Sequence, residues 1–159
     1  MYYLDTCLGE FVERFRKTKA WDNTLVILLP DHGIPYKEID ERHPLMNHIP
    51  MIWVGGAVKE PRRVEQVCNQ TDLPATLLGQ LGLNHDQFTF SRDVLSKSYT
   101  RPFAIHTYDD GFSMTDSTSF VCFDFIYGKT TAEIGTKNEH LIQQGKAILQ
   151  AASKDLDKR

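Results

Sequence analysis

The sequence predicts an α/β fold that is followed by a small antiparallel sheet with a C-terminal helix. In the first half, an amphipathic segment, a short turn and an apolar run succeed one another, as in half of a βαβ unit. In the second half, an Asp-Gly pair separates two segments rich in β-branched and aromatic residues, which is typical of a β-hairpin. Segment 139–156 then repeats apolar residues at spacings of three and four, which predicts a closing helix.

Composition places the chain among ordinary globular proteins. Of its 159 residues 41% are hydrophobic and 25% are charged, which suffices for a buried core. The net charge of −3 argues against a nucleic-acid-binding surface, and no apolar run approaches the roughly 20 residues of a membrane span. Cys7, Cys68 and Cys122 are widely spaced, so we expect buried thiols rather than a disulfide framework or a metal knuckle.

The first half contains a predicted helix, strand and turn that belong together. Residues Tyr3 to Lys19 show a helical apolar face, and the run Leu25 to Leu29 predicts a strand that is buried on both faces. Pro30 ends this strand because it has no N–H to donate. Since no strand precedes the helix, we expect the chain to start inside a larger fold. It should then expose apolar surface, self-associate, or leave an edge of this strand unpaired.

Further elements follow in order. Ile49 to Trp53 predicts a second strand, and Val64 to Val67 is compatible with a short one. Asp72 is a suitable N-cap for a helix, with Pro74 in the first turn and Gly82 just beyond its end. Residues 88–95, FTFSRDVL, predict a loop that leads into one helical turn.

The second half predicts an antiparallel sheet under a helix. Phe103 to Tyr108 and Phe112 to Met114 flank Asp109-Asp110-Gly111, where Asp-Gly would supply positive φ angles. Ser119 to Tyr127 is a third candidate strand. Glu139 to Leu156 is the closing helix, with one apolar face for packing on the sheet.

Asp31 and His32 are the first candidate functional residues. They follow the predicted buried strand at its carboxyl end, where open α/β sheets bind ligands. A carboxylate beside an imidazole can coordinate a metal ion, and Gly33 would let the backbone turn away sharply. The alternative is a simple turn or helix cap in which Asp31 accepts backbone N–H groups and His32 lies on the surface.

Several motifs in a fixed order resemble those of the alkaline phosphatase/sulfatase superfamily. They are NTLVILLPDHG, HP, HIPMIWVGG, QTDLPATLLGQLGL and FSRDVL. The set is most similar to the lipoteichoic acid synthase-like, or phosphoglycerol transferase, branch, and YDDGF and GKAILQ resemble the C-terminal end of its bacterial members. The resemblance implies that residues 1–100 form the C-terminal part of an α/β catalytic core shaped as an alkaline phosphatase-like sandwich. Residues 101–159 would form a small antiparallel subdomain with a closing helix.

The resemblance also implies roles for individual residues. Asp31 and His32 match the paired metal ligands, and His43 matches a histidine that contacts the phosphoryl oxygens or the leaving group. His48 matches more loosely, and Arg92 either approaches a phosphate or pairs with Asp93 or Asp110. No site motif includes the remaining histidines: His85, His106 and His140.

The implied cofactor is a divalent metal, with Mn²⁺ or Zn²⁺ favoured over Ca²⁺. Sulfatases of this superfamily typically bind Ca²⁺ through oxygens and carry Asn where His32 stands, whereas an imidazole suits Mn²⁺ or Zn²⁺. Two ligands alone hold an ion weakly, so we expect weak binding by this chain. Nothing before Asp31 matches the family nucleophile, a Thr in phosphoryl transfer. We therefore expect the nucleophile outside this chain and the isolated chain to be inactive.

Three functions remain open from the sequence. The first is phosphoryl transfer of the phosphoglycerol or phosphoethanolamine transferase type; the second is sulfuric ester hydrolysis; the third is a non-catalytic binding or structural module. The expected partners are the upstream part of the same polypeptide and a phospholipid head group or other ester, with self-association possible and no nucleic acid. The resemblance implies a location on the extracytoplasmic face of a bacterial membrane.

Overall fold

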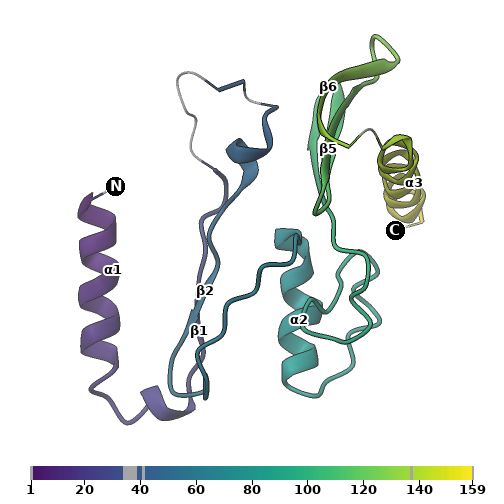
Figure 1. Ribbon diagram of the computed structural model, residues 1–159. Helices are drawn as coiled ribbons and strands as arrows, with labels where there is room; N and C mark the ends of the chain where they lie inside the picture. Colours follow the sequence, from purple (N-terminus) through teal and green to yellow (C-terminus); the bar gives the residue numbers. More distant parts are fainter. Residues whose placement is uncertain (1, 34–38, 41, 137, 159) are drawn as a thin grey trace. The chain divides into compact units, whose positions relative to one another are not determined.

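The computed structural model describes residues 2–33, 39–40, 42–136 and 138–158 (Figure 1). Contacts divide the chain into two compact units. The first unit comprises Met1–Ile39 and Leu45–Val64, and the second comprises Asp40–Pro44 and Glu65–Arg159. The predicted division at residue 100 concerns the domains of a parent protein and stays a prediction. Among the described residues, no helix has both the length and the apolar character needed to span a membrane.

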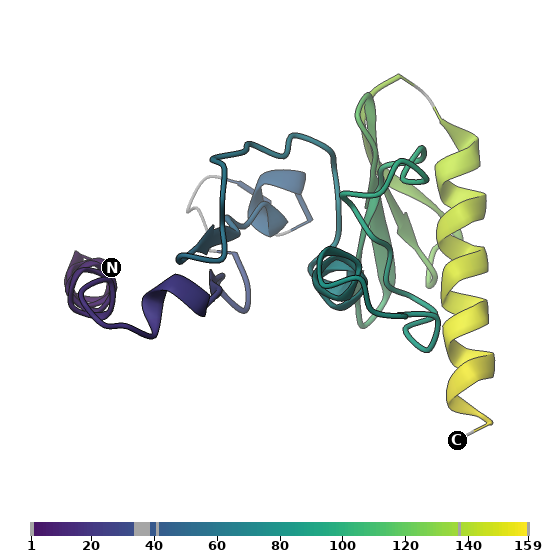
Figure 2. The same cartoon turned by 90° about the horizontal axis from the view of Figure 1, so that it is seen from below.

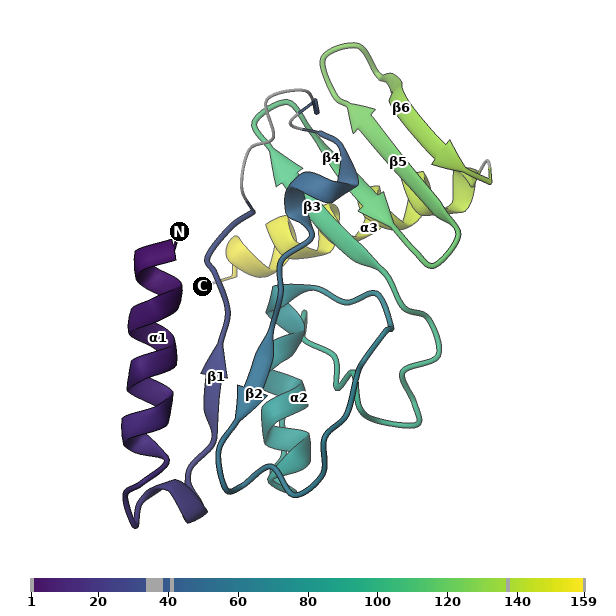
Figure 3. The ribbon, with the colours of Figure 1, turned by 60° about the vertical axis from the view of Figure 1, so that its left-hand side comes forward.

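The first unit consists of one long helix and a two-stranded sheet. Helix α1 (Tyr2–Phe15) and the 3-10 turn η1 (Trp21–Asn23) precede β1 (Val26–Leu28), which pairs antiparallel with β2 (Ile52–Val54) (Figure 3). The helix ends earlier than the predicted Lys19. Turn hydrogen bonds follow the end of the helix. The Thr18 N–H donates to the Phe15 carbonyl at 2.9 Å, and the Thr18 hydroxyl donates to the same carbonyl at 2.8 Å.

Burial in the first unit differs from the prediction. Strand β1 is half-buried rather than buried on both faces, and its described neighbour is β2 alone. The predicted unpaired edge is therefore confirmed for the described residues. Helix α1 buries none of its side chains and exposes Tyr2, Tyr3 and Leu4 to solvent. The segment Val64 to Val67 forms no strand because it has no ladder partner, and it connects the first unit to the second.

Helix α2 (Leu73–Gln80) in the second unit begins and ends as predicted. The 3-10 turn η3 (Gln70–Asp72) leads into it, and a proline lies in its first turn. Gly82 follows the helix with φ +67°. Its N–H donates to the Gly79 carbonyl at 3.1 Å, and the Leu83 N–H donates to the Leu78 carbonyl at 2.9 Å. These two bonds form a Schellman motif, which only a residue tolerant of positive φ supports well.

The second unit also contains a four-stranded antiparallel sheet whose strands follow chain order (Figure 3). Its strands are β3 (Ala104–Tyr108), β4 (Gly111–Thr115), β5 (Ser119–Asp124) and β6 (Lys129–Gly135). The sequence did not predict β6, because nearly all its residues are exposed and show no apolar alternation. The predicted helical turn within residues 88–95 is wrong as well: this segment runs through turns without helix.

Helix α3 (Glu139–Leu156) packs on the sheet and has the predicted bounds (Figure 2). The buried cluster joins strands β4 and β5 to the helix, and comprises Phe112, Met114, Val121, Phe123 and Leu141. Gly145 lets the helix approach closely, since a Cβ there would lie 2.1 Å from a Phe112 ring carbon. The mixed α/β class, with antiparallel strands and a C-terminal helix, is therefore as predicted.

The turn between β3 and β4 lacks the positive φ angles that the sequence predicted. Asp109 and Asp110 form its two-residue loop, and neither has a positive φ. Gly111 does not have one either, but a Cβ there would lie 2.1 Å from the Phe123 carbonyl oxygen. Glycine is required because the neighbouring strand lies close, and not because of the turn's dihedral angles.

Candidate metal pair and histidine loop

Asp31 and His32 lie just beyond β1 with their ligand atoms close together. The Nδ1 atom of His32 is 2.7 Å from the Gly33 carbonyl oxygen. Because a carbonyl only accepts, Nδ1 carries the proton and Nε2 keeps its lone pair in the neutral ring. Nε2 lies 3.6 Å from Oδ1 of Asp31. Metal-binding histidines commonly use such a hydrogen bond from the second ring nitrogen to fix tautomer and orientation.

This geometry fits a shared divalent ion. Ligand atoms about 2.1 Å from one metal lie roughly 3 to 3.5 Å apart, close to the observed separation. The His32 N–H also donates to Asp31 Oδ1 at 3.1 Å, which orients the carboxylate. Both side chains are exposed, by 88% for Asp31 and 77% for His32, so an ion can reach them. In the described ranges no cluster of three or more His, Cys, Asp or Glu residues joins this pair.

Gly33 has a spatial role at this site. Its φ is not positive, so glycine is not needed here for a left-handed backbone. A Cβ on Gly33 would lie 1.7 Å from the Met46 carbonyl oxygen, in the 3-10 turn η2 (Pro44–Asn47). His48 follows this turn and is exposed; no observation tests its predicted role. The segment between Gly33 and Asn47 includes residues 34–38 and 41, which lie outside the described residues.

His43 belongs to a short segment of the second unit. Its N–H donates to the Asp40 carbonyl at 2.9 Å, and the Arg42 N–H donates to Oδ1 of Asp40 at 2.8 Å. The Arg42 guanidinium donates to Oδ2 of Asp110 at 2.8 Å, in the turn between β3 and β4. A second carboxylate, Asp124, lies 3.9 Å from Nη1 of Arg42. These contacts tie the segment that carries His43 to the antiparallel sheet.

The surroundings of Arg42 favour its charged state. The Asp110 carboxylate raises the pKa of Arg42. Tyr108, whose ring lies 5.6 Å from the guanidinium carbon, is half-buried, and burial raises the pKa of its phenol. Its hydroxyl lies 3.2 Å from the sulfur of Cys122, the only buried thiol among the three cysteines. Sequence reasoning missed Arg42, because the arginine follows no motif of its own.

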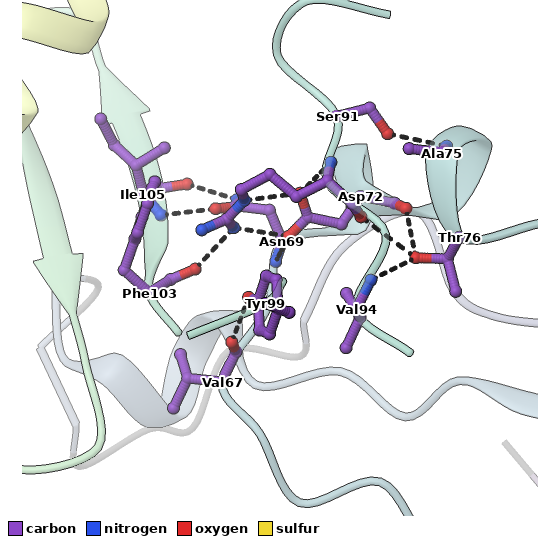
Figure 4. A network of polar contacts seen from close by, with 11 residues as sticks. Val67, Asn69, Asp72, Ala75, Thr76, Ser91, Val94, Tyr99, Phe103 and Ile105 are labelled. Carbon is purple, nitrogen blue, oxygen red and sulfur yellow. Dashed lines mark hydrogen bonds and ion pairs between the residues drawn. The ribbon is translucent and has the colours of Figure 1, made fainter. Parts of the chain in front are cut away.

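Arg92 belongs to a polar network around Asp72. Figure 4 shows this network with Asp72 labelled. Nε donates to Oδ1 of Asp72 at 2.9 Å and Nη2 to Oδ2 at 2.5 Å, a fork that matches the carboxylate. Nη2 also donates to the Phe103 carbonyl at 2.9 Å, and the guanidinium carbon lies 3.7 Å from the centroid of the Phe103 ring. The ion pair of Arg92 is therefore with Asp72, and not with either of the aspartates that the sequence suggested.

The same network joins two motifs of the resemblance. The Thr76 hydroxyl lies 2.7 Å from the Asp72 carbonyl and accepts the Val94 N–H at 3.1 Å. The Ser91 hydroxyl accepts the Ala75 N–H at 2.9 Å, so QTDLPAT and FSRDV are joined at several points (Figure 4). Asp72 serves this network, and its side chain does not cap α2. These contacts support the structural interpretation of Arg92, whose role toward phosphate stays a prediction.

One histidine outside the site motifs, His106, lies within the antiparallel sheet. His106 on β3 contacts the edge of Tyr108, with ring centroids 5.3 Å apart. Burial lowers the pKa of His106, which keeps the ring neutral near pH 7. A neutral ring beside an aromatic neighbour is typical of a structural histidine, and no site motif includes His106.

Comparison with known proteins identifies the family. The sulfatase family model matches residues 1–83, more than half of the chain, and the chain therefore belongs to the sulfatase family. The chain is also similar to the crystal structure of a protein in the alkaline phosphatase superfamily from Vibrio parahaemolyticus. The TM-score is 0.74 and the sequence identity 26%, over 98% of this chain and 40% of that one. The chain thus spans well under half of that relative, whose superfamily contains enzymes that generally depend on divalent metals.

Proposed function

We propose that this member of the sulfatase family is the C-terminal part of a metal-dependent phosphoryl-transfer enzyme, of which Asp31 and His32 supply two metal ligands. The observation that carries the proposal is the oriented pair beyond β1, with Nε2 of His32 3.6 Å from Oδ1 of Asp31. The Nδ1 contact to Gly33 leaves Nε2 available for coordination.

The donor set indicates which metal the pair would hold. One carboxylate oxygen and one imidazole nitrogen suit Mn²⁺ or Zn²⁺ better than Ca²⁺, which prefers an all-oxygen shell. When bound, such an ion would stabilise charge on the phosphoryl oxygens and activate a Thr nucleophile, which we place outside this chain. Asp31 and His32 would hold it from one side, and the remaining ligands would come from the upstream polypeptide.

His43 would act on the substrate. Its imidazole would donate a hydrogen bond to a phosphoryl oxygen or to the leaving group, as the resemblance implies. The motif order favours the phosphoglycerol or phosphoethanolamine transferase type, whose substrate is a phospholipid head group on the extracytoplasmic face of a bacterial membrane. The exposed apolar side chains of α1 support contact with the upstream polypeptide or with a second copy of this chain.

Sulfuric ester hydrolysis is the second candidate, favoured by the match to the sulfatase family model. A sulfate ester presents oxygens of similar geometry, so Asp31 and His32 would serve either reaction. The donor set argues against it, because the resemblance implies that sulfatases of this superfamily typically bind Ca²⁺ through oxygens, with Asn where His32 stands.

Metal binding is the most direct test. We expect Mn²⁺, titrated into the isotopically labelled chain, to broaden the amide resonances of Asp31, His32 and Gly33 first, with an affinity weaker than micromolar. Asp31→Ala and His32→Ala should each remove this effect, while His85→Ala serves as the matched control. Broadening that starts elsewhere would overturn the assignment. Submicromolar binding that Asp31→Ala abolishes would instead show that the site is complete within this chain.

Substrate class requires the longer polypeptide. We expect Mn²⁺-dependent turnover of a chromogenic phosphodiester, little turnover of the matching sulfate ester, and loss of activity in Asp31→Ala. Preference for the sulfate ester would establish the second candidate. No turnover of either ester would favour the non-catalytic module. Metal-dependent turnover by the 159-residue chain alone would show that our placement of the nucleophile is wrong.

A further inference from the structure

The five residues Asp40–Pro44 group with the second unit, although the chain on either side of them groups with the first. Arg42 of this segment makes long-range contacts, to Asp110 at 2.8 Å and to Asp124 at 3.9 Å. The segment that carries His43 is thus held by the antiparallel sheet.

The carboxylates that receive Arg42 are held by the sheet itself. The backbone carbonyl of Asp110 accepts the Phe125 N–H at 2.8 Å, which fixes the turn against the end of β5. Asp124 is only 2% exposed, and its Oδ1 accepts the Tyr127 N–H at 2.9 Å. A buried carboxylate is costly without a countercharge, and the guanidinium of Arg42 supplies one.

The ion pair of Arg42 also restrains His43, because the two residues are neighbours in the chain. Consecutive Cα atoms are about 3.8 Å apart, so fixing Arg42 restricts where the His43 backbone can lie. Asp40 closes the turn, because its carbonyl accepts the His43 N–H and its carboxylate accepts the Arg42 N–H. The Arg42 side chain and the turn at Asp40 together restrain the residue that carries the imidazole.

We propose that Asp110, acting through Arg42, is a positioning residue that holds the His43 segment on the antiparallel sheet. The catalytic part of this inference rests on the proposed role of His43, whereas the anchoring part does not. The antiparallel half of the chain would then position His43, and it also forms the buried core together with α3.

Hydrogen exchange in the 159-residue chain tests the anchor. In Asp110→Asn, which keeps the shape but removes the charge, we expect the His43 amide to exchange at least about tenfold faster. The Val121 amide, in the core strand, should keep its rate. Asp109→Asn, the neighbouring aspartate in the same turn, is the matched control and should leave His43 unchanged. Arg42→Gln should reproduce the effect of Asp110→Asn, and Arg42→Lys should restore part of the protection.

Two exchange results would overturn the anchor. An unchanged His43 rate in both Asp110→Asn and Arg42→Gln would mean that the ion pair does not restrain the segment. An equal rise at Val121 in both variants would mean that these residues stabilise the sheet and do not position the loop.

Kinetics of the longer polypeptide test the catalytic consequence. Asp110→Asn should lower kcat about tenfold or more while changing KM little, because a misplaced catalytic group affects the reaction more than ground-state binding. Faster exchange at His43 with an unchanged kcat would overturn the positioning role. If the wild-type protein has no esterase activity, the proposed function fails, and the exchange experiment alone still decides the anchor.

Discussion

The two units of this chain differ in what holds them together. Among the described residues, every buried side chain lies in the second unit, where sheet and helix α3 enclose Phe112, Met114 and Val121. In the first unit α1 buries nothing and β1 is half-buried, yet that unit carries Asp31 and His32. The candidate metal pair therefore lies in the unit without a core of its own, whereas His43 and the buried core belong to the second unit. Substitutions of one kind should accordingly have different effects in the two units.

The largest contrast should come from two phenylalanines. Phe112 is fully buried and stacks on Phe123, with centroids 5.8 Å apart, so Phe112→Ala should lower the free energy of unfolding by about 4 kcal/mol. Phe11 on α1 is 47% exposed, and Phe11→Ala should cost less than about 1 kcal/mol. Urea denaturation of both variants measures the difference. An equal loss of unfolding free energy in the two variants would show that the first unit has a buried core as well.

Removal of the Asp72 charge should have the next largest effect. Asp72 is 1% exposed and accepts both arms of the Arg92 fork, so Asp72→Asn should destabilise the chain by about 3 kcal/mol. Asp86→Asn, at an exposed position with a local contact to Asn84, is the control and should be nearly neutral. Thermal unfolding at low and high salt should show a similar loss for Asp72→Asn, because burial limits screening. A loss that vanishes at high salt would place this pair among surface ion pairs.

The same glycine substitution should have opposite signs in the two units. Gly82 has φ +67° in the Schellman motif, and Gly82→Ala should cost about 1 kcal/mol. Gly9 lies within α1 with nothing near its missing Cβ, so Gly9→Ala should stabilise that helix by about 0.5–1 kcal/mol. Far-ultraviolet circular dichroism during unfolding follows both changes. Stabilisation by Gly82→Ala would argue against the left-handed cap.

A pH dependence is expected in the second unit. Burial raises the pKa of Tyr99 from 10.0 to about 12, and its hydroxyl donates to the Val67 carbonyl at 2.6 Å. The unfolded chain therefore loses this proton at lower pH than the folded chain. The resulting stability is complete below pH 10 and is lost as pH rises toward about 12.

Two measurements check this dependence. Tyrosinate absorbance should show late-titrating tyrosines, of which Tyr99→Phe removes one and leaves Tyr108. The decline in stability above pH 10 should be shallower in that variant. An unchanged tyrosinate titration in Tyr99→Phe would show that Tyr99 is not among the tyrosines that titrate late.

Local patterns were sufficient for several elements. The apolar periodicity of residues 139–156 predicted α3 with its observed bounds, and Gly82 predicted the end of α2. The position of Asp31 and His32 directly after an apolar run predicted the candidate metal pair. These features depend on backbone geometry and burial within a few turns, which neighbouring residues determine.

Tertiary structure alone decided the partners of the charged groups. Arg42 and Asp110 are 68 residues apart in sequence and Arg92 and Asp72 are 20 apart, and neither pairing follows from a local pattern. The sequence suggested that Gly33 and Gly111 are turn residues. In the structure, a backbone carbonyl of another segment lies so close to each of them that a Cβ would clash with it. Periodicity reports what one segment buries, whereas an ion pair or a close approach depends on where the folded chain brings the second segment.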